Sequence, residues 1–177
     1  VVAPGLIERP YIFAGNDTPG VMLSGAVRRL INLWAVKPGT KAVVLSANPE
    51  GEAVLADLES AGVKIVAALD VWTGEDIVEV EGKSRVDKVV LGDGRTVSAD
   101  LVVVGTGWTA PTSLLNMAGD RPVYDPSAAR YFSNHLPDNV LATGGITGNG
   151  TTAELVAHGR ATGSLAASRA LRSRHDR

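Results

Sequence analysis

The sequence predicts an α/β protein in which a parallel β-sheet, its helices and a small antiparallel meander form one three-layer unit. Three observations predict this fold class. A strand, a helix and a second strand follow one another between residues 41 and 70, short alternating strands occupy residues 77–97, and a long helical segment lies near the end of the chain. A strand, a helix and a strand in this order are typical of a parallel sheet. The helix carries the chain back to the end of the sheet where the first strand began, so the second strand runs in the same direction.

The segment 41–70 carries the clearest pattern. Ala42–Ser46 is an apolar run suited to a strand that is buried on both faces, and Lys64–Leu69 is a second strand. The apolar residues between them recur at helical spacing, and Gly62 ends the predicted helix. This order is that of a Rossmann-like nucleotide-binding unit. Asp70 ends the second strand, where an acidic residue can bond a ribose hydroxyl or can simply serve a turn.

The phosphate loop of this unit has lost most of its glycines. A dinucleotide-binding unit has G-x-G-x-x-G after its first strand, so that bare backbone can approach the pyrophosphate. Those positions are Ser46, Asn48 and Gly51 here. Pro49 also lacks a backbone N–H, and Glu50 places a negative charge where an anion would lie. We therefore expect a unit that is Rossmann-like in shape and poorly equipped to bind NAD.

The elements around this unit are also predicted. Residues 11–20 have the composition of a surface connection, and Val21–Val36 has the apolar spacing of a helix, with Trp34 as a packing anchor. Residues 77–97 form a meander that covers one face of the parallel sheet. Leu101–Val104 is a buried strand, and the glycines that follow it, Gly105 and Gly107, allow close approach by a ligand or by a neighbouring backbone.

The last third holds the strongest site signal. Asn139–Thr143 reads as a short strand, and four glycines occur between residues 144 and 150. A helix follows from about Thr152 to Arg172, and Thr151 with Glu154 forms a capping box at its start. The glycine-rich turn before a helix N-terminus predicts an anion-binding nest. Small residues along the helix would let it lie close on a sheet: Ala153, Ala157, Gly159, Ala161, Gly163, Ala166 and Ala167.

Composition excludes several classes of function. The chain has 177 residues, a net charge of −2 and no cysteine, which excludes disulfides, thiolate metal sites and dithiol reductases. No apolar run approaches the ~20 residues of a membrane span, and no basic stripe suggests nucleic acid. The three histidines lack metal-ligand spacing, so we expect no metal site. No acid, base or nucleophile stands in a pattern that predicts a catalytic residue. The chain begins at Val1, without a leader, so we expect a cytoplasmic fragment, processed chain or domain.

Several segments resemble a known family. Glu8-Arg9-Pro10, the run from Gly15 to Met22 and Gly107-Trp108 are similar to segments of the flavoproteins with two dinucleotide-binding domains, and most of all to alpha subunits of heterotetrameric sarcosine oxidase and related amine- or opine-oxidising complexes. The resemblance implies that residues 1–14 and 113–177 form part of an FAD or dinucleotide-binding domain that lacks its first glycine-rich segment. It implies that residues 15–112 are an inserted NAD-like domain with a degenerate glycine loop.

The resemblance also implies where a cofactor would be held. The family has an A-T-G turn at residues 3–5 and often Gly-Asp at residues 144–145, so Pro4 and Gly145 are departures. We expect Gly145→Asp to be tolerated by the fold. Together with the strand ends described above, this gives nine candidate cofactor-binding residues: Ala3, Pro4, Gly5, Gly105, Thr106, Gly144, Gly145, Thr151 and Thr152. This assignment requires Gly5 and Gly144 to lie side by side.

The implied function is a portion of a subunit of a flavin-dependent amine oxidoreductase, acting within a hetero-oligomer. The oxidation would take place on a partner subunit, and this chain would carry FAD or NAD, whose own chemistry performs hydride transfer. Whether the chain is an enzyme by itself stays open. The alternative is a structural or assembly module that has lost nucleotide binding, which the altered loop at residues 46–51 favours. A conventional pyridine-nucleotide reductase is disfavoured by the missing Cys pair and by Asn48-Pro49-Glu50.

Overall fold

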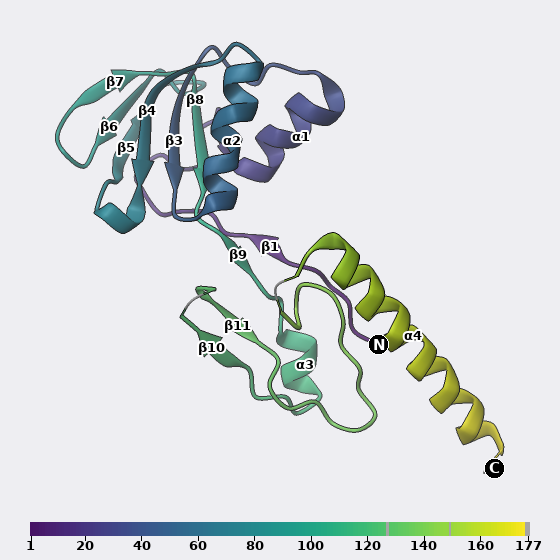
Figure 1. The fold of residues 1–177 in the computed structure, drawn as a ribbon. Helices are drawn as coiled ribbons and strands as arrows, with labels where there is room; N and C mark the ends of the chain where they lie inside the picture. The colour runs from purple at the N-terminus through teal and green to yellow at the C-terminus, as the bar shows by residue number, and fades with distance from the viewer. Residues whose placement is uncertain (127, 149, 176–177) are drawn as a thin grey trace. The chain divides into compact units, whose positions relative to one another are not determined.

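The structure, a computed structural model, describes residues 1–126, 128–148 and 150–175. The chain divides into two compact units (Figure 1), which we call unit 1 (Val1–Ile7 with Trp108–Arg177) and unit 2 (Glu8–Gly107). The sequence analysis placed the corresponding borders after residues 14 and 112. Its assignment of each part to a kind of cofactor stays a prediction, and the two units are described separately.

Unit 2 is built on a four-stranded parallel sheet. Its strands are β2 (Val21–Leu23), β8 (Leu101–Gly105), β3 (Lys41–Ser46) and β4 (Lys64–Asp70), in that order across the sheet. All of β8 and all of β3 except Lys41 are buried. Both strands have neighbours on either side and layers on both faces, which is why their sequences are continuous apolar runs rather than alternating ones.

Two helices and a meander cover the two faces of this sheet. The helices α1 (Ser24–Trp34) and α2 (Pro49–Ser60) lie on one face (Figure 1), where Val27, Val54 and Leu58 pack against β3 and β8. The other face is covered by the antiparallel strands β5 (Ile77–Glu81), β6 (Lys88–Leu91) and β7 (Thr96–Ser98). A short 3-10 helix, η1 (Val71–Thr73), follows β4. The predicted α/β fold class and the covering meander are confirmed.

The predicted helix at residues 21–36 is wrong in its first turn and in its anchor. Val21–Leu23 pairs with β8 as an edge strand, and α1 begins only at Ser24, because the neighbouring strand offers backbone partners that local helical spacing does not reveal. Burial falls along α1, from Val27 through half-buried Ile31 to Trp34, which is 70% exposed. Trp34 is therefore not a packing anchor within the described chain.

Unit 1 has a small core, and all of its elements except α4 are short. Its elements are β9 (Trp108–Thr109), α3 (Ser113–Met117), β10 (Val123–Asp125), β11 (Arg130–Phe132) and α4 (Thr152–His175), and Ile7 begins the short strand β1 (Ile7–Glu8). The core consists of Ala110, Leu115, Ala142 and Ile146. The predicted strand at residues 139–143 is wrong: Ala142 makes a single bridge to Val2. A strand needs a continuous ladder, and a single bridge does not make one.

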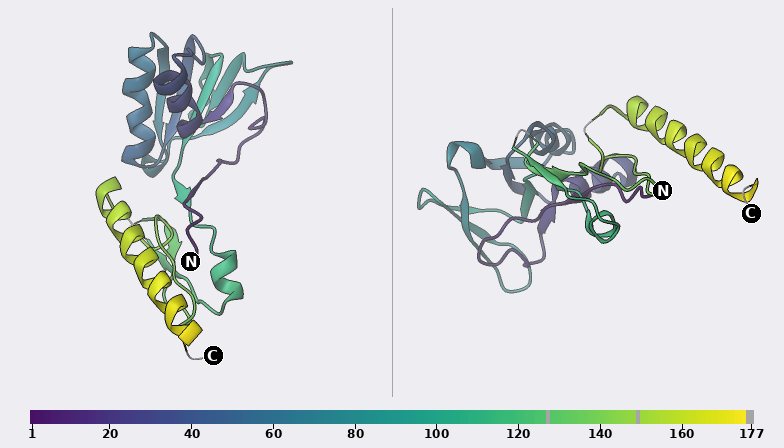
Figure 2. Two further views of the ribbon diagram at one scale, coloured as in Figure 1. Left: turned by 90° about the vertical axis from the view of Figure 1, so that its right-hand side faces the viewer. Right: turned by 90° about the horizontal axis from the view of Figure 1, so that it is seen from below.

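The long helix α4 confirms the predicted start and length. It is uninterrupted in both views of Figure 2. Its expected close packing on a sheet is wrong within the described chain, because most of its small residues are exposed. Among residues 152–172 of α4, those that are buried wholly or in part form a single stripe at helical spacing: Leu155, Gly159, Thr162 and Ala166.

In the part of the chain that the structure describes, no helix is long and apolar enough to span a membrane. Among the same residues, no three His, Asp or Glu side chains gather closely enough to hold a metal ion.

Candidate functional site

In unit 1, the N-terminal segment runs alongside residues 141–145. The Val2 N–H donates to the Leu141 carbonyl at 2.7 Å, and the Thr143 N–H donates to the Val2 carbonyl at 3.0 Å. Further along, Leu6 lies against Gly145. These contacts bring residues 3–5 and residues 144–145 side by side, as the candidate site requires.

Gly5 and Gly144 share an unusual backbone geometry. Their φ angles are +72° and +83°, a conformation that L side chains rarely adopt. A Cβ atom added to either glycine would meet no other atom within 4 Å. Bare backbone that faces open space in two adjacent segments is what close approach of a ligand requires.

Gly145 differs from its neighbour. A Cβ atom at Gly145 would lie 2.8 Å from Cγ of Leu6, so any side chain there would displace this leucine. The atoms in the way belong to one half-buried side chain and none to the backbone, so the expectation that Gly145→Asp is tolerated stays a prediction. Leu6 belongs to the residues packed against the core of unit 1, and the sequence pattern could not reveal a contact across more than a hundred residues.

A capping box caps the N-terminus of α4. The Glu154 carboxylate accepts hydrogen bonds from the Thr151 N–H at 2.7 Å and from the Thr151 hydroxyl at 2.8 Å. The bond from the backbone N–H, followed by that from the hydroxyl, lowers the pKa of Glu154. This carboxylate brings a negative charge to the helix N-terminus, where it opposes the predicted anion nest. A role of Thr151 or Thr152 in holding a cofactor stays a prediction.

Sequence reasoning did not include His158 in the site. Its Nδ1 lies 3.1 Å from the hydroxyl of buried Thr143, one residue before Gly144, and its carbonyl accepts a hydrogen bond from the Thr162 hydroxyl at 2.8 Å. His158 thus links the glycine-bearing turn to α4.

In unit 2, the degenerate loop and the end of β8 pack directly on each other. A Cβ atom on Gly51 would lie 2.2 Å from the Gly105 carbonyl oxygen, and one on Gly105 would lie 2.5 Å from Cα of Gly51. Of the two alternatives for Gly105, the structure therefore shows close approach by a neighbouring backbone. A role of Gly105 in binding a cofactor stays a prediction.

Thr106 is held by Arg9, which the sequence singled out only as part of a family-like segment. The Thr106 carbonyl accepts a hydrogen bond from Arg9 Nη2 at 3.0 Å, and its hydroxyl donates to the Arg9 carbonyl at 3.3 Å. Gly105 and Thr106 belong to unit 2, whereas the other seven candidates belong to unit 1. The candidates therefore fall into two separate groups.

Asp70 is a turn residue, one of the two roles left open for it. Its carboxylate accepts a hydrogen bond from the Trp72 N–H at 2.9 Å and caps η1. The indole N–H of Trp72 in turn donates to the Ala47 carbonyl. The expected effects of the Pro49 and Glu50 side chains lie outside the described residues.

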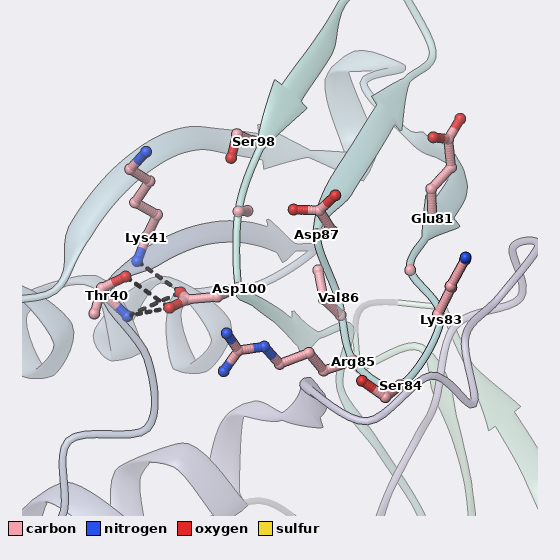
Figure 3. A pocket seen from close by; sticks show the side chains of 12 residues that line it. Thr40, Lys41, Glu81, Lys83, Ser84, Arg85, Val86, Asp87, Ser98 and Asp100 are labelled. Carbon is pink, nitrogen blue, oxygen red and sulfur yellow. Dashed lines mark hydrogen bonds between the residues drawn. The ribbon is translucent and has the colours of Figure 1, made fainter.

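A hollow of about 660 Å³ lies at the opposite, amino-terminal edge of the same sheet (Figure 3). Asp100 anchors it by accepting from the Thr40 N–H and hydroxyl and from the Lys41 N–H, at 2.6–3.0 Å. Burial alone would raise the pKa of Asp100, but these hydrogen bonds lower it. The charged lining residues balance in number: Lys41, Lys83 and Arg85 against Glu81, Asp87 and Asp100. Parallel sheets bind ligands at their carboxyl ends, so we assign no site here.

Comparison with known proteins gives one consistent result. No model of a known protein family matches the sequence. The chain is 30% identical over 199 residues to sarcosine oxidase subunit alpha of Corynebacterium sp. strain P-1, with 96% of this chain and 20% of that protein covered. It is 29% identical over 179 residues to the subunit of the same name in Rhizobium meliloti strain 1021, with 91% and 18% covered. The chain spans about one fifth of the length of the curated relatives it matches.

Solved structures share the fold. L-proline dehydrogenase from P. horikoshii matches with a TM-score of 0.68 and 20% identity, over 81% of this chain and 29% of that one. At this level of identity the likeness shows the fold alone. It supports the α/β architecture that the sequence predicts.

Proposed function

Because nearly the whole chain is related in sequence to the alpha subunits of sarcosine oxidase, we propose that it is the dinucleotide-binding portion of a subunit of a flavin-dependent, sarcosine-like amine oxidoreductase. Its partners are the other subunits of that complex, and its cofactor is FAD or NAD. The oxidation takes place on a partner subunit, since no residue pattern in this chain predicts a catalytic acid, base or nucleophile. A cytoplasmic location belongs to the same proposal.

One structural observation carries the assignment of the cofactor to unit 1. Gly5 and Gly144 lie in neighbouring segments, both have positive φ, and open space faces both. This arrangement fits a ligand that approaches bare backbone. A bound dinucleotide would supply hydride transfer. The residues of this chain would position it, with His158 holding Thr143 and the adjoining turn against α4.

Binding measurements test this proposal. The purified protein is titrated with FAD, followed by flavin fluorescence, and with NAD⁺, followed by calorimetry. We expect one of the two to bind saturably, and Gly144→Val to weaken that binding at least tenfold, because a β-branched residue cannot hold this φ without strain.

The matched control is Gly163→Val. Gly163 lies on α4 with no atom within 4 Å of an added Cβ and no positive φ. This variant should bind as the unchanged protein does. Absence of saturable binding, or equal affinities for the Gly144→Val and Gly163→Val proteins, would contradict the proposal.

A further inference from the structure

The carboxyl edge of the sheet in unit 2 is the place where a Rossmann-like fold takes its nucleotide. From its hydrogen bonds we infer that this crevice is occupied by side chains of the chain itself, so that unit 2 binds no dinucleotide and any dinucleotide of this chain is held in unit 1. This inference goes beyond the proposed function and does not depend on it.

The phosphate position is the first to be filled. In a nucleotide-binding unit, free N–H groups of the first helical turn bind the pyrophosphate. Here the Gly51 N–H donates to Asn48 Oδ1 at 2.8 Å, so the amide side chain takes the place of a phosphate oxygen. The Gly51 backbone also rests on that of Gly105, so that α2 begins close against the end of β8.

The guanidinium group of Arg9 lies next to this loop, against Gly107. Arg9 lies at the end of β8, with Nη2 bonded to the Thr106 carbonyl at 3.0 Å and its backbone N–H bonded to the Gly107 carbonyl at 2.8 Å. A Cβ atom on Gly107 would lie 3.0 Å from Arg9 Nη2 and 3.2 Å from Asn48 Nδ2. The Arg9 and Asn48 side chains therefore both lie against Gly107, just beyond the carboxyl end of β8.

The residue at the ribose position, Asp70, also makes a hydrogen bond within unit 2. The Asp70 carboxylate, which would bond ribose hydroxyls in a nucleotide-binding unit, caps η1 through the Trp72 N–H at 2.9 Å. The Trp72 indole N–H binds the Ala47 carbonyl, within the loop that follows β3. The first turn of α2, the Arg9 guanidinium and the Asp70 carboxylate thus each make hydrogen bonds within unit 2, and a nucleotide would compete with these bonds.

Amide NMR of the ¹⁵N-labelled protein tests the inference. ADP-ribose is the probe, because it carries the diphosphate and the adenine-side ribose. We expect the resonances of the Gly51, Gly105 and Gly107 amides and of the Trp72 indole to stay unchanged up to millimolar ADP-ribose. We also expect Asn48→Ala to speed hydrogen exchange of the Gly51 amide at least tenfold. The control Asn116→Ala, on exposed α3, should leave that exchange rate unchanged.

Two results would overturn the inference. One is a saturable shift of the Gly51, Gly105 or Gly107 resonances with ADP-ribose. The other is Gly51 exchange that is as fast in the unchanged protein as in Asn48→Ala. The same spectra distinguish the two proposals, because binding in unit 1 would shift the amide resonances of Gly5 and Gly144. Shifts confined to unit 1 support both proposals, and a spectrum that stays unchanged throughout supports this one while contradicting the proposed function for this probe.

Discussion

Gly51→Val should lower the free energy of unfolding of unit 2 by about 3 kcal/mol or more, beyond the usual 1–3 kcal/mol cost of overpacking. The reason is that a Cβ atom at residue 51 would lie 2.2 Å from the Gly105 carbonyl oxygen and 3.0 Å from Cβ of Ser46. Both obstacles belong to central strands of the sheet, so neither can move as a flexible side chain end can. Urea unfolding followed by circular dichroism measures the loss.

The control for this prediction is again Gly163→Val, which adds the same side chain to a helix where nothing stands within 4 Å. Its unfolding midpoint should change little. An unchanged midpoint for Gly51→Val would show that α2 does not rest on the end of β8, and the inference about the closed crevice would lose its first support.

Asp120→Ala should destabilise unit 1 by about 3 kcal/mol, because hydrogen bonds to a charged group contribute about 1.5–3 kcal/mol each. Asp120 is 1% exposed. Its Oδ1 accepts hydrogen bonds from the backbone N–H groups of Arg121 at 2.8 Å, Asn134 at 3.2 Å and His135 at 2.8 Å. The alanine side chain has no oxygen, so these three N–H groups lose their acceptor. Thermal unfolding of the variant measures the effect.

The same carboxylate makes stability depend on pH. Burial alone would raise the pKa of Asp120, but hydrogen bonds from His135, Ser133, Asn134 and Arg121 lower it. The folded state then binds the proton less tightly than the unfolded state. The stabilisation is therefore complete above the unfolded value of about 3.9 and is lost as the pH falls below it, through the folded pKa.

Two further variants complete this test. Asp120→Asn keeps an acceptor oxygen, so it should lower the free energy of unfolding less than Asp120→Ala does. Because the amide does not titrate, this variant should also lose less stability below pH 4. Asp138→Ala removes an exposed carboxylate and should have little effect. Equal stability of the Asp120→Ala and Asp138→Ala proteins would show that Asp120 does not hold the segments on either side of it together.

Much of unit 2 could be predicted because its signals are local. The apolar run of β3, the helical spacing of α2 and the alternation of the meander each follow from burial of nearby residues. Val21–Leu23 was mistaken for helix because its partner is β8, some eighty residues later. The sequence predicted Trp34 in the core because helical spacing shows which residues lie on one face of a helix. It does not show where the sheet under that face ends, and Trp34 is exposed.

The candidate site was predicted in part for the same reason. The capping box of Thr151 and Glu154 joins residues close in sequence, so its pattern could be read directly. The hydrogen bond between His158 and Thr143, the hold of Arg9 on Thr106 and the contact of Leu6 with Gly145 all join residues far apart, and no local pattern reports them.

By itself, the sequence determined the α/β class, the lost glycine loop and the relationship to a known family, because backbone conformation and burial leave short-range periodic marks. Only the tertiary structure decided what fills the space that the lost glycines left. That outcome depends on which side chains meet at the ends of strands brought together from distant parts of the chain, and there Asn48, Arg9 and Asp70 prove to be bonded within the protein.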